Sequence, residues 1–169
     1  MPDIDIPALA TASQLSEFRG APFPEETVRA AGEQIRVLCG WHIAPEVTST
    51  LVLDSPGGIV LRLPTGHVTE VTEVTDLTGT EERALTGWRW SAHGMLSRPG
   101  GFPSGFRAVR VVMTHGYPTC PPDLLAVLAN RTQRRVMQES LGSRSVTYSA
   151  EGDRALEDSL ARRRIGPSA

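Results

Sequence analysis

The chain has 169 residues and a mass of 18.2 kDa, enough for one domain or for one domain with a tail. Apolar residues make up 40% of the sequence and charged residues 21%, so most of the chain can bury a core. All 17 basic residues are arginine. The absence of lysine excludes P-loop nucleotide hydrolases, kinases and enzymes that form a Schiff base, because each of these classes needs a particular lysine.

Charge is divided unevenly along the sequence. Residues 1–97 carry a net charge of -7 and residues 98–169 a net charge of +5, for a total of -2. This division suits a protein that meets another protein, or another copy of itself, through opposite charges. The overall charge is unlike that of a general DNA-binding module, which has a basic excess. Two cysteines form no disulfide framework, and the sequence shows no signal peptide or membrane span, so we expect a soluble protein made in a reducing cytoplasm.

Two helices are predicted near the N-terminus. Thr11 and Gln14 have the spacing of a capping box, which predicts a short helix that ends at Gly20. Residues 24–39 are predicted to form an amphipathic helix, because a proline and two glutamates open it, apolar residues recur at helical spacing and Gly40 closes it.

A meander of short antiparallel strands is predicted next, because the apolar period changes to two. Pro56-Gly57-Gly58 is interpreted as a hairpin turn, and the segment 98–105 as an exposed Pro/Gly loop. One strand contains a slip in its alternation, which predicts a bulge. The predicted strands cover residues 47–53, 59–63, 67–75, 88–90 and 106–114.

A long helix is predicted over residues 122–141 and is followed by an extended tail. The tail has few large apolar residues, so we expect it to stay unpacked until a partner binds, with a short helix over residues 153–164. The fold class is therefore α+β: N-terminal helices, a meander of short antiparallel strands, a long C-terminal helix and the tail. The chain divides into an N-terminal arm (1–8), a main domain (9–142) and the tail (143–169).

One constellation has the residue types of a metal site. Cys39 with His42 and His115 with Cys120 form a Cys-x2-His and a His-x4-Cys pair, which could make a Cys2His2 zinc site. The spacing is not a known finger pattern, and two buried thiols with two turn histidines explain the same residues. A Cys–His nucleophile lacks an evident orienting residue. We therefore expect no enzyme and no cofactor, and keep a small metal-binding or hydrolytic protein as the alternative.

Aromatic and arginine side chains supply the candidate contact residues. The tryptophans could stack on bases, but we favour core packing or a subunit interface, with Trp88 and Trp90 on one strand face. The basic run 162–164 could contact DNA phosphates or dock on an acidic protein surface. The candidates for a subunit or neck interface are Trp41, Trp88, Trp90, Phe102, Arg131, Arg134 and Arg135.

Four segments, in the same order, resemble the head-to-tail connector family of tailed phages (adaptor or head-completion proteins). Residues 9–15 resemble its N-terminal "A-T-x-x-x-L" helix, and residues 30–43 its second helix with Ile-Arg and then Gly-Trp. Residues 63–71 are similar to its "L-P-x-x-P-V-x-x-V" turn and strand, and residues 111–124 to its "V-x-x-T-H-G-Y … P-x-D-L" junction. The lysine-free, Ala/Gly/Pro-rich composition points to an actinobacterial phage.

The resemblance implies a structural virion protein, a head-to-tail adaptor that forms a ring, usually of twelve copies, below the portal. Such a ring extends the DNA channel, meets stopper or tail proteins and lets genomic DNA pass without sequence recognition. It implies a place in the virion neck after synthesis in the host cytoplasm, with no membrane. The C-terminal segment of such proteins commonly reaches the portal, so the portal-binding candidates are Arg144, Arg154, Arg162, Arg163 and Arg164.

Overall fold

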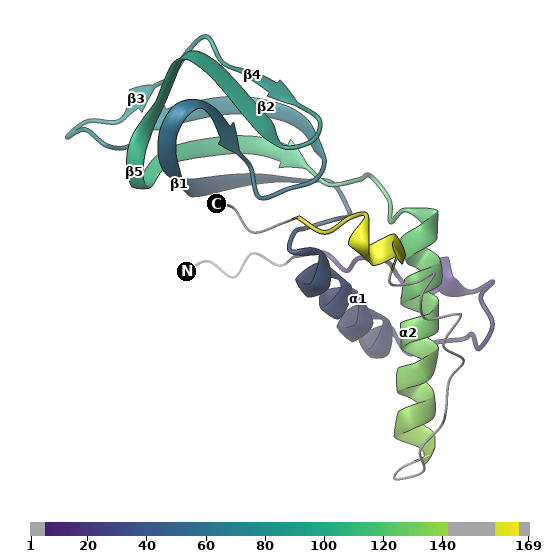
Figure 1. Ribbon diagram of the computed structural model, residues 1–169. Helices are drawn as coiled ribbons and strands as arrows, with labels where there is room; N and C mark the ends of the chain where they lie inside the picture. The colour runs from purple at the N-terminus through teal and green to yellow at the C-terminus, as the bar shows by residue number, and fades with distance from the viewer. Residues whose placement is uncertain (1–5, 142–157, 166–169) are drawn as a thin grey trace. The chain divides into compact units, whose positions relative to one another are not determined.

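The computed structural model describes residues 6–141 and 158–165, which divide into two compact units. The helical unit contains the chain up to Pro45 and again from Tyr117 to Arg164. The sheet unit runs from Glu46 to Gly116, so it is inserted in the sequence between the two parts of the helical unit (Figure 1). The fold class is α+β, as predicted.

The helical unit contains a short 3-10 helix and two longer helices at the positions that the sequence indicates. One half of the predicted capping box is present: the Thr11 N–H donates to Gln14 Oε1 at 2.8 Å, whereas the Gln14 N–H bonds to the backbone oxygen of Thr11 and not to its hydroxyl. The first long helix follows Pro24 and ends at Gly40, whose φ of 80° lets its N–H bond to the carbonyl oxygen of Arg36. The elements are η1 (Ser13–Leu15), α1 (Glu25–Cys39) and α2 (Pro122–Leu141).

Apolar side chains of α1 and α2 form the core of the helical unit. The most buried are at most 1% exposed: Val28, Ala31 and Ile35 of α1, and Leu124, Val127 and Leu128 of α2. Their spacing of three or four residues keeps them on one face of each helix. Gly32 lies beside Leu9, and a Cβ added there would be 3.0 Å from the Leu9 Cβ, so only glycine fits without a shift of the N-terminal segment.

The described part of the tail differs from the expectation of an unpacked segment. Residues 158–161 form a helical turn, and Leu160 is buried in the helical unit with 3% of its surface exposed. The reason is that Leu160 is buried and that arginines beside it bind residues of α1 and α2. The low apolar content of the tail does not indicate these contacts. Residues 153–157 of the predicted helix lie outside the described residues.

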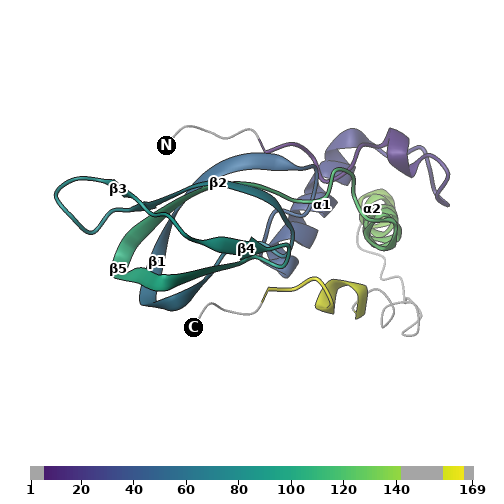
Figure 2. The ribbon, with the colours of Figure 1, turned by 90° about the horizontal axis from the view of Figure 1, so that it is seen from above.

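In the described chain, the sheet unit is a five-stranded antiparallel sheet in the order β1-β5-β2-β3, with β4 also paired to β5. At one end His115 of β5 lies opposite Val47 of β1 and Val68 of β2. The strands curve round on themselves, as Figure 1 and Figure 2 show from two directions. Their buried apolar side chains form one core cluster. The strands are β1 (Val47–Arg62), β2 (Val68–Asp76), β3 (Arg83–Ala84), β4 (Arg89–Ser91) and β5 (Met95–His115).

Two predictions in this sheet are wrong. Pro56-Gly57-Gly58 lies inside the continuous strand β1, where both glycines have a positive φ and register shifts bend the strand without ending it. The segment 98–105 lies inside β5, and its Phe102 pairs with Gly58 of β1. Each glycine-rich segment is thus the hydrogen-bonding partner of the other, and pairing between distant segments leaves no local signal.

The predicted slip in the third strand is confirmed. The register of β2 against β5 shifts between Val68 and Glu70 and again between Val71 and Glu73. Each shift adds a residue to β2, so Val68, Val71 and Val74 all reach the core although they are three positions apart. Each of these valines is at most 6% exposed.

Candidate functional site

The four residues of the proposed metal cluster do not come together. Among the described residues, no group of three or more His, Cys, Asp or Glu side chains could hold a metal ion. Cys39 and Cys120 are free, buried thiols of the helical unit, whereas His115 belongs to the sheet unit and its Nε2 lies 2.9 Å from Ser49 Oγ. The Nε2 of His42 contacts the carbonyl oxygen of Pro45.

The two thiols are also poor nucleophiles. Burial, with the nearby charge of Asp123, raises the pKa of the Cys120 thiol to about 12. Burial likewise raises the pKa of Cys39 above its ordinary value. A cysteine nucleophile reacts as the thiolate, which is scarce at neutral pH when the pKa is raised. The geometry therefore gives the metal-binding or hydrolytic alternative no support.

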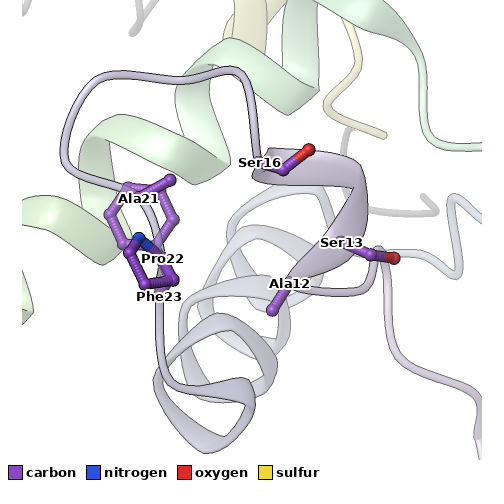
Figure 3. A pocket seen from close by; sticks show the side chains of 6 residues that line it. All are labelled: Ala12, Ser13, Ser16, Ala21, Pro22 and Phe23. Atoms are coloured by element: carbon purple, nitrogen blue, oxygen red, sulfur yellow. The ribbon is translucent and has the colours of Figure 1, made fainter.

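A hollow of about 390 Å3 lies in the helical unit between η1 and the loop that precedes α1 (Figure 3). Its lining residues are Ala12, Ser13, Ser16, Ala21, Pro22 and Phe23. These side chains provide two hydroxyl groups and otherwise small or apolar surface. With no acid, base or thiol among them, the hollow lacks the groups that a catalytic site needs.

No helix within the described ranges is long and apolar enough to cross a membrane.

The candidate interface residues differ widely in exposure. Phe102 is 6% exposed and belongs to the core of the sheet unit. Trp88 packs against that core and donates from Nε1 to the Leu85 carbonyl oxygen at 2.9 Å. Trp90, on β4, keeps 37% of its surface exposed, so it is the most exposed of the three predicted candidates in this unit. The arginines of α2, Arg131, Arg134 and Arg135, are half-buried.

The remaining candidates that the structure describes are Trp41 and the arginines 162–164. They lie together at the C-terminal segment, residues 158–164, which contacts the helical unit. We call these contacts the clasp: Leu160 and Arg163 of the segment, with Trp41, Tyr117 and Asp123 of the helical unit. Arg163 binds the Asp123 carboxylate with both ends of its fork, from Nη2 to Oδ1 at 2.8 Å and from Nε to Oδ2 at 3.2 Å. Its guanidinium also lies over the ring of Tyr117, 5.2 Å from the centroid.

The backbone of the segment is bound as well as its side chains. The indole Nε1 of Trp41 donates to the carbonyl oxygen of Arg163 at 2.7 Å. Arg164 donates from Nε to the carbonyl oxygen of Leu38 near the end of α1, at 3.0 Å. Arg162 instead bonds within the segment, from Nη2 to Ser159 Oγ at 3.1 Å. The three adjacent arginines therefore have three different environments.

Asp123 is the anionic group of the clasp. Burial acts to raise the pKa of Asp123, but the hydrogen bonds and charge of Arg163 outweigh burial, and the pKa lies below its ordinary value. The Arg163 side chain is 22% exposed and that of Asp123 is 34% exposed, so solvent partly screens the pair. The sequence indicates Trp41 and Arg163 as contact residues but not Asp123. Positions 123 and 163 are 40 residues apart in the sequence, so no local pattern indicates that they pair.

Three solved chains are similar to this one in fold. A chain in the neck of an empty gene transfer agent (GTA) particle computed with C6 symmetry is 18% identical, with a TM-score of 0.62 over 93% of this chain and 88% of that chain. A chain in the neck of a native GTA particle computed with C12 symmetry is 18% identical, with a TM-score of 0.59 over 85% and 82%. A chain in the virion of a native GTA particle is 18% identical, with a TM-score of 0.63 over 95% and 92%.

No protein-family model and no curated protein matches the sequence. The likeness to the GTA chains spans both the helical unit and the sheet unit, since it covers most of the chain. At 18% identity it shows that the folds are alike. The chain therefore has the fold of a chain found in the neck of a gene transfer agent particle.

Proposed function

We propose that the chain is a structural protein of a virion neck, a head-to-tail adaptor that joins the capsid to the tail and carries out no catalysis. The observation that carries the proposal is the agreement of fold with a GTA neck chain over 93% of this chain. The four sequence segments that resemble phage connector proteins support it independently, because that resemblance lies in the residues and not in the fold.

The adaptor forms a ring, of twelve copies in this proposal, that lies below the portal and extends the DNA channel. The symmetries of the similar neck particles, C6 and C12, support a ring. Each subunit of a closed ring needs two unlike faces, which the opposite net charges of the two halves of the sequence favour. Genomic DNA passes through the lumen without sequence recognition, and no membrane takes part.

The partners in this proposal are the portal protein on one side and stopper or tail proteins on the other. Of the tail arginines proposed to bind the portal, Arg163 and Arg164 are engaged in the clasp, and Arg162 bonds to Ser159. Arg144 and Arg154 lie outside the described residues. A deletion of the tail would also remove the buried Leu160, so substitutions test portal binding more cleanly than truncation.

Electron microscopy of the purified chain mixed with portal rings of the same phage tests the proposal. We expect an added ring of density with the symmetry of the portal. The double variant Arg144→Ser/Arg154→Ser should reduce this decoration at least tenfold, whereas Arg29→Ser, at an exposed arginine of α1, should leave it unchanged. Portal rings that stay bare at a saturating concentration of the folded wild-type chain would refute the adaptor role.

A further inference from the structure

The clasp lies at the opposite end of α2 from the point where the chain leaves that helix. Asp123 lies in the first turn of α2, and the chain leaves α2 after Leu141, at its other end. At about 1.5 Å per residue, the 20 residues of α2 span about 30 Å. The 16 residues from 142 to 157 that link α2 to the segment can extend to about 50 Å. The link is therefore long enough to reach Asp123 of the same chain, or of a neighbouring copy at a similar distance.

The helical-unit side of the clasp has the chemistry of an arginine-peptide site. The Asp123 carboxylate accepts the planar fork of a guanidinium, the Tyr117 ring stacks against the cation, and the Trp41 indole N–H binds a backbone carbonyl oxygen. The two rings lie 6.2 Å apart between centroids and are tilted by 53°. These groups recognise an arginine together with the backbone of the same residue, so they fit an arginine-bearing helical turn and not a free cation.

The segment is held by few contacts. The contacts described are one buried leucine, one partly exposed ion pair, the stacking of Arg163 on Tyr117, the Trp41 bond and the Arg164 bond. Every one of these contacts can form equally well with a segment from another copy, so effective concentration decides which copy fills the site. A ring holds neighbouring sites at a fixed, short distance. If each subunit donates its segment to the next, the closed ring leaves no site empty and no segment unbound.

We propose that the site formed by Trp41, Tyr117 and Asp123 binds residues 158–164 of a second copy of the chain, so that neighbouring subunits are joined by exchanged C-terminal segments. The proposal adds an intersubunit contact to the proposed ring and rests on the adaptor role for its setting. It makes Arg163 a residue that binds the chain to itself, and it leaves Arg144 and Arg154 as the tail arginines that bind the portal.

Charge reversal tests the exchange with full-length chains. Asp123→Arg and Arg163→Asp each place like charges in a chain's own clasp. In an equimolar mixture, Arg163 of the first variant can bind Asp123 of the second. The arginine introduced at position 123 of the first variant can likewise bind the aspartate introduced at position 163 of the second. We expect native mass spectrometry to show a heteromer in the mixture and only monomers for each variant alone. A mixture of folded variants that stays monomeric would overturn the proposal.

The double variant Asp123→Arg/Arg163→Asp is the matched control, because it restores an opposite-charge pair within one chain. We expect it to associate with itself as the wild type does. Circular dichroism checks that each variant is folded before the mixture is made.

A peptide titration keeps the proposal testable if a charge-reversed variant fails to fold. A fluorescent peptide of residues 158–165 is added to the full-length Arg163→Gln chain, in which the native segment is weakened and Asp123 is kept. We expect saturable binding, at least tenfold weaker for a peptide with Arg163→Gln and unchanged for a peptide with Arg162→Gln, because Arg162 bonds only within the segment among the contacts described. Absence of binding, or equal binding of all three peptides, would contradict the site.

The two experiments distinguish a failure of the exchange from a failure of the adaptor role. Decorated portal rings without a heteromer would leave the adaptor role standing and overturn the exchange. A heteromer with bare portal rings would support the exchange and count against the adaptor role.

Discussion

Gly94 is the glycine whose replacement the fold tolerates least. Its φ of 76° is in the left-handed region, and a Cβ added there would lie 2.2 Å from the carbonyl oxygen of Thr65. Gly87 has a similar φ of 74° but no atom within 4 Å of the added Cβ. The two positions therefore separate the effect of backbone conformation from that of a close approach.

We expect Gly87→Ala to lower the free energy of unfolding by about 1–2 kcal/mol, from the left-handed backbone alone. Gly94→Ala should lower it by a further 1–3 kcal/mol or so, because Thr65 must move. Chemical denaturation of the two variants measures the difference. Equal losses would show that the backbone near Thr65 adjusts freely.

The Arg163–Asp123 pair gives the clasp a dependence on pH. The pKa of Asp123 in the folded chain is below its ordinary value of 3.8, so the carboxylate stabilises the fold at and above that pH. This stability is lost as the pH falls below 3.8 and through the folded pKa, because the unfolded chain then binds the proton more strongly.

We expect Asp123→Asn to lower the melting temperature at pH 7, with a difference from the wild type that shrinks steadily at pH values below the ordinary pKa of 3.8. Thermal unfolding of both proteins across that pH range measures it. Because the pair is partly exposed, added salt should also reduce the difference. A difference that stays the same at every pH would mean that the lost hydrogen bonds of the side chain, and not its charge, account for the effect.

The sequence could not distinguish these residues from their neighbours. Gly94 and Gly87 are alike in a local pattern, and only the fold brings Thr65 next to one of them. Asp123 lies in the first turn of α2, but its partner Arg163 comes from the end of the chain. In both cases the deciding contact lies between residues that are distant in the sequence.

At the scale of elements, β5 carries one phenylalanine inside the sheet and one outside. Phe102 is 6% exposed in the core, and Phe106 on the same strand is 91% exposed. Phe106 stands beside Arg107, which has a φ of 50° and whose N–H bonds to Asp54 Oδ1 at 2.7 Å. This local distortion of the strand accompanies the change from a buried to an exposed phenylalanine.

We expect Phe102→Ala to lower the free energy of unfolding by about 3–5 kcal/mol, because it leaves a cavity in the core. Phe106→Ala is the matched control and should change it by less than about 0.5 kcal/mol, because the ring contacts little. Urea denaturation of the isolated chain measures both. A small effect of Phe102→Ala would return this residue to the candidate interface.

The elements with local start and stop signals were predictable. Pro24 and Gly40 bound α1, and the spacing of Val68 and Val71 predicts one slip in β2, where the structure has two. The long strands were not, because Gly57 and Gly58 look like a hairpin turn until their partner in β5 is known. A glycine pair permits either a turn or a bend within a strand, and the pairing strand decides between them.

At the scale of the whole molecule, the described chain consists of two units, each with apolar side chains of its own. The core cluster of the sheet unit is drawn entirely from residues between Leu61 and Met113. We therefore expect a fragment of residues 46–116 to fold without the helices, with dispersed amide proton signals in nuclear magnetic resonance and a cooperative thermal transition. A fragment without either property would show that the sheet depends on the helical unit.

The division into units was not evident from the sequence. Pro45 and the Pro-rich segment 116–122 lie at the two boundaries, but such residues also connect elements within one domain, and the sequence predicts a single domain over residues 9–142. What marks the boundary is pairing: Val47 lies opposite His115 at the start and end of the sheet unit. Such a pairing joins positions at the two ends of a long segment and has no local sequence signature.

The two crossings between the units are also adjacent on the helical side, where the Tyr117 N–H bonds to the carbonyl oxygen of Ile43 at 2.7 Å. A segment whose two ends are neighbours can be exchanged for another of different length or sequence without separating the parts that flank it. Recombination between related genes could therefore replace residues 46–116 as a cassette. The surface of the sheet would then diversify at its own pace, while α1, α2 and the C-terminal segment stayed the same.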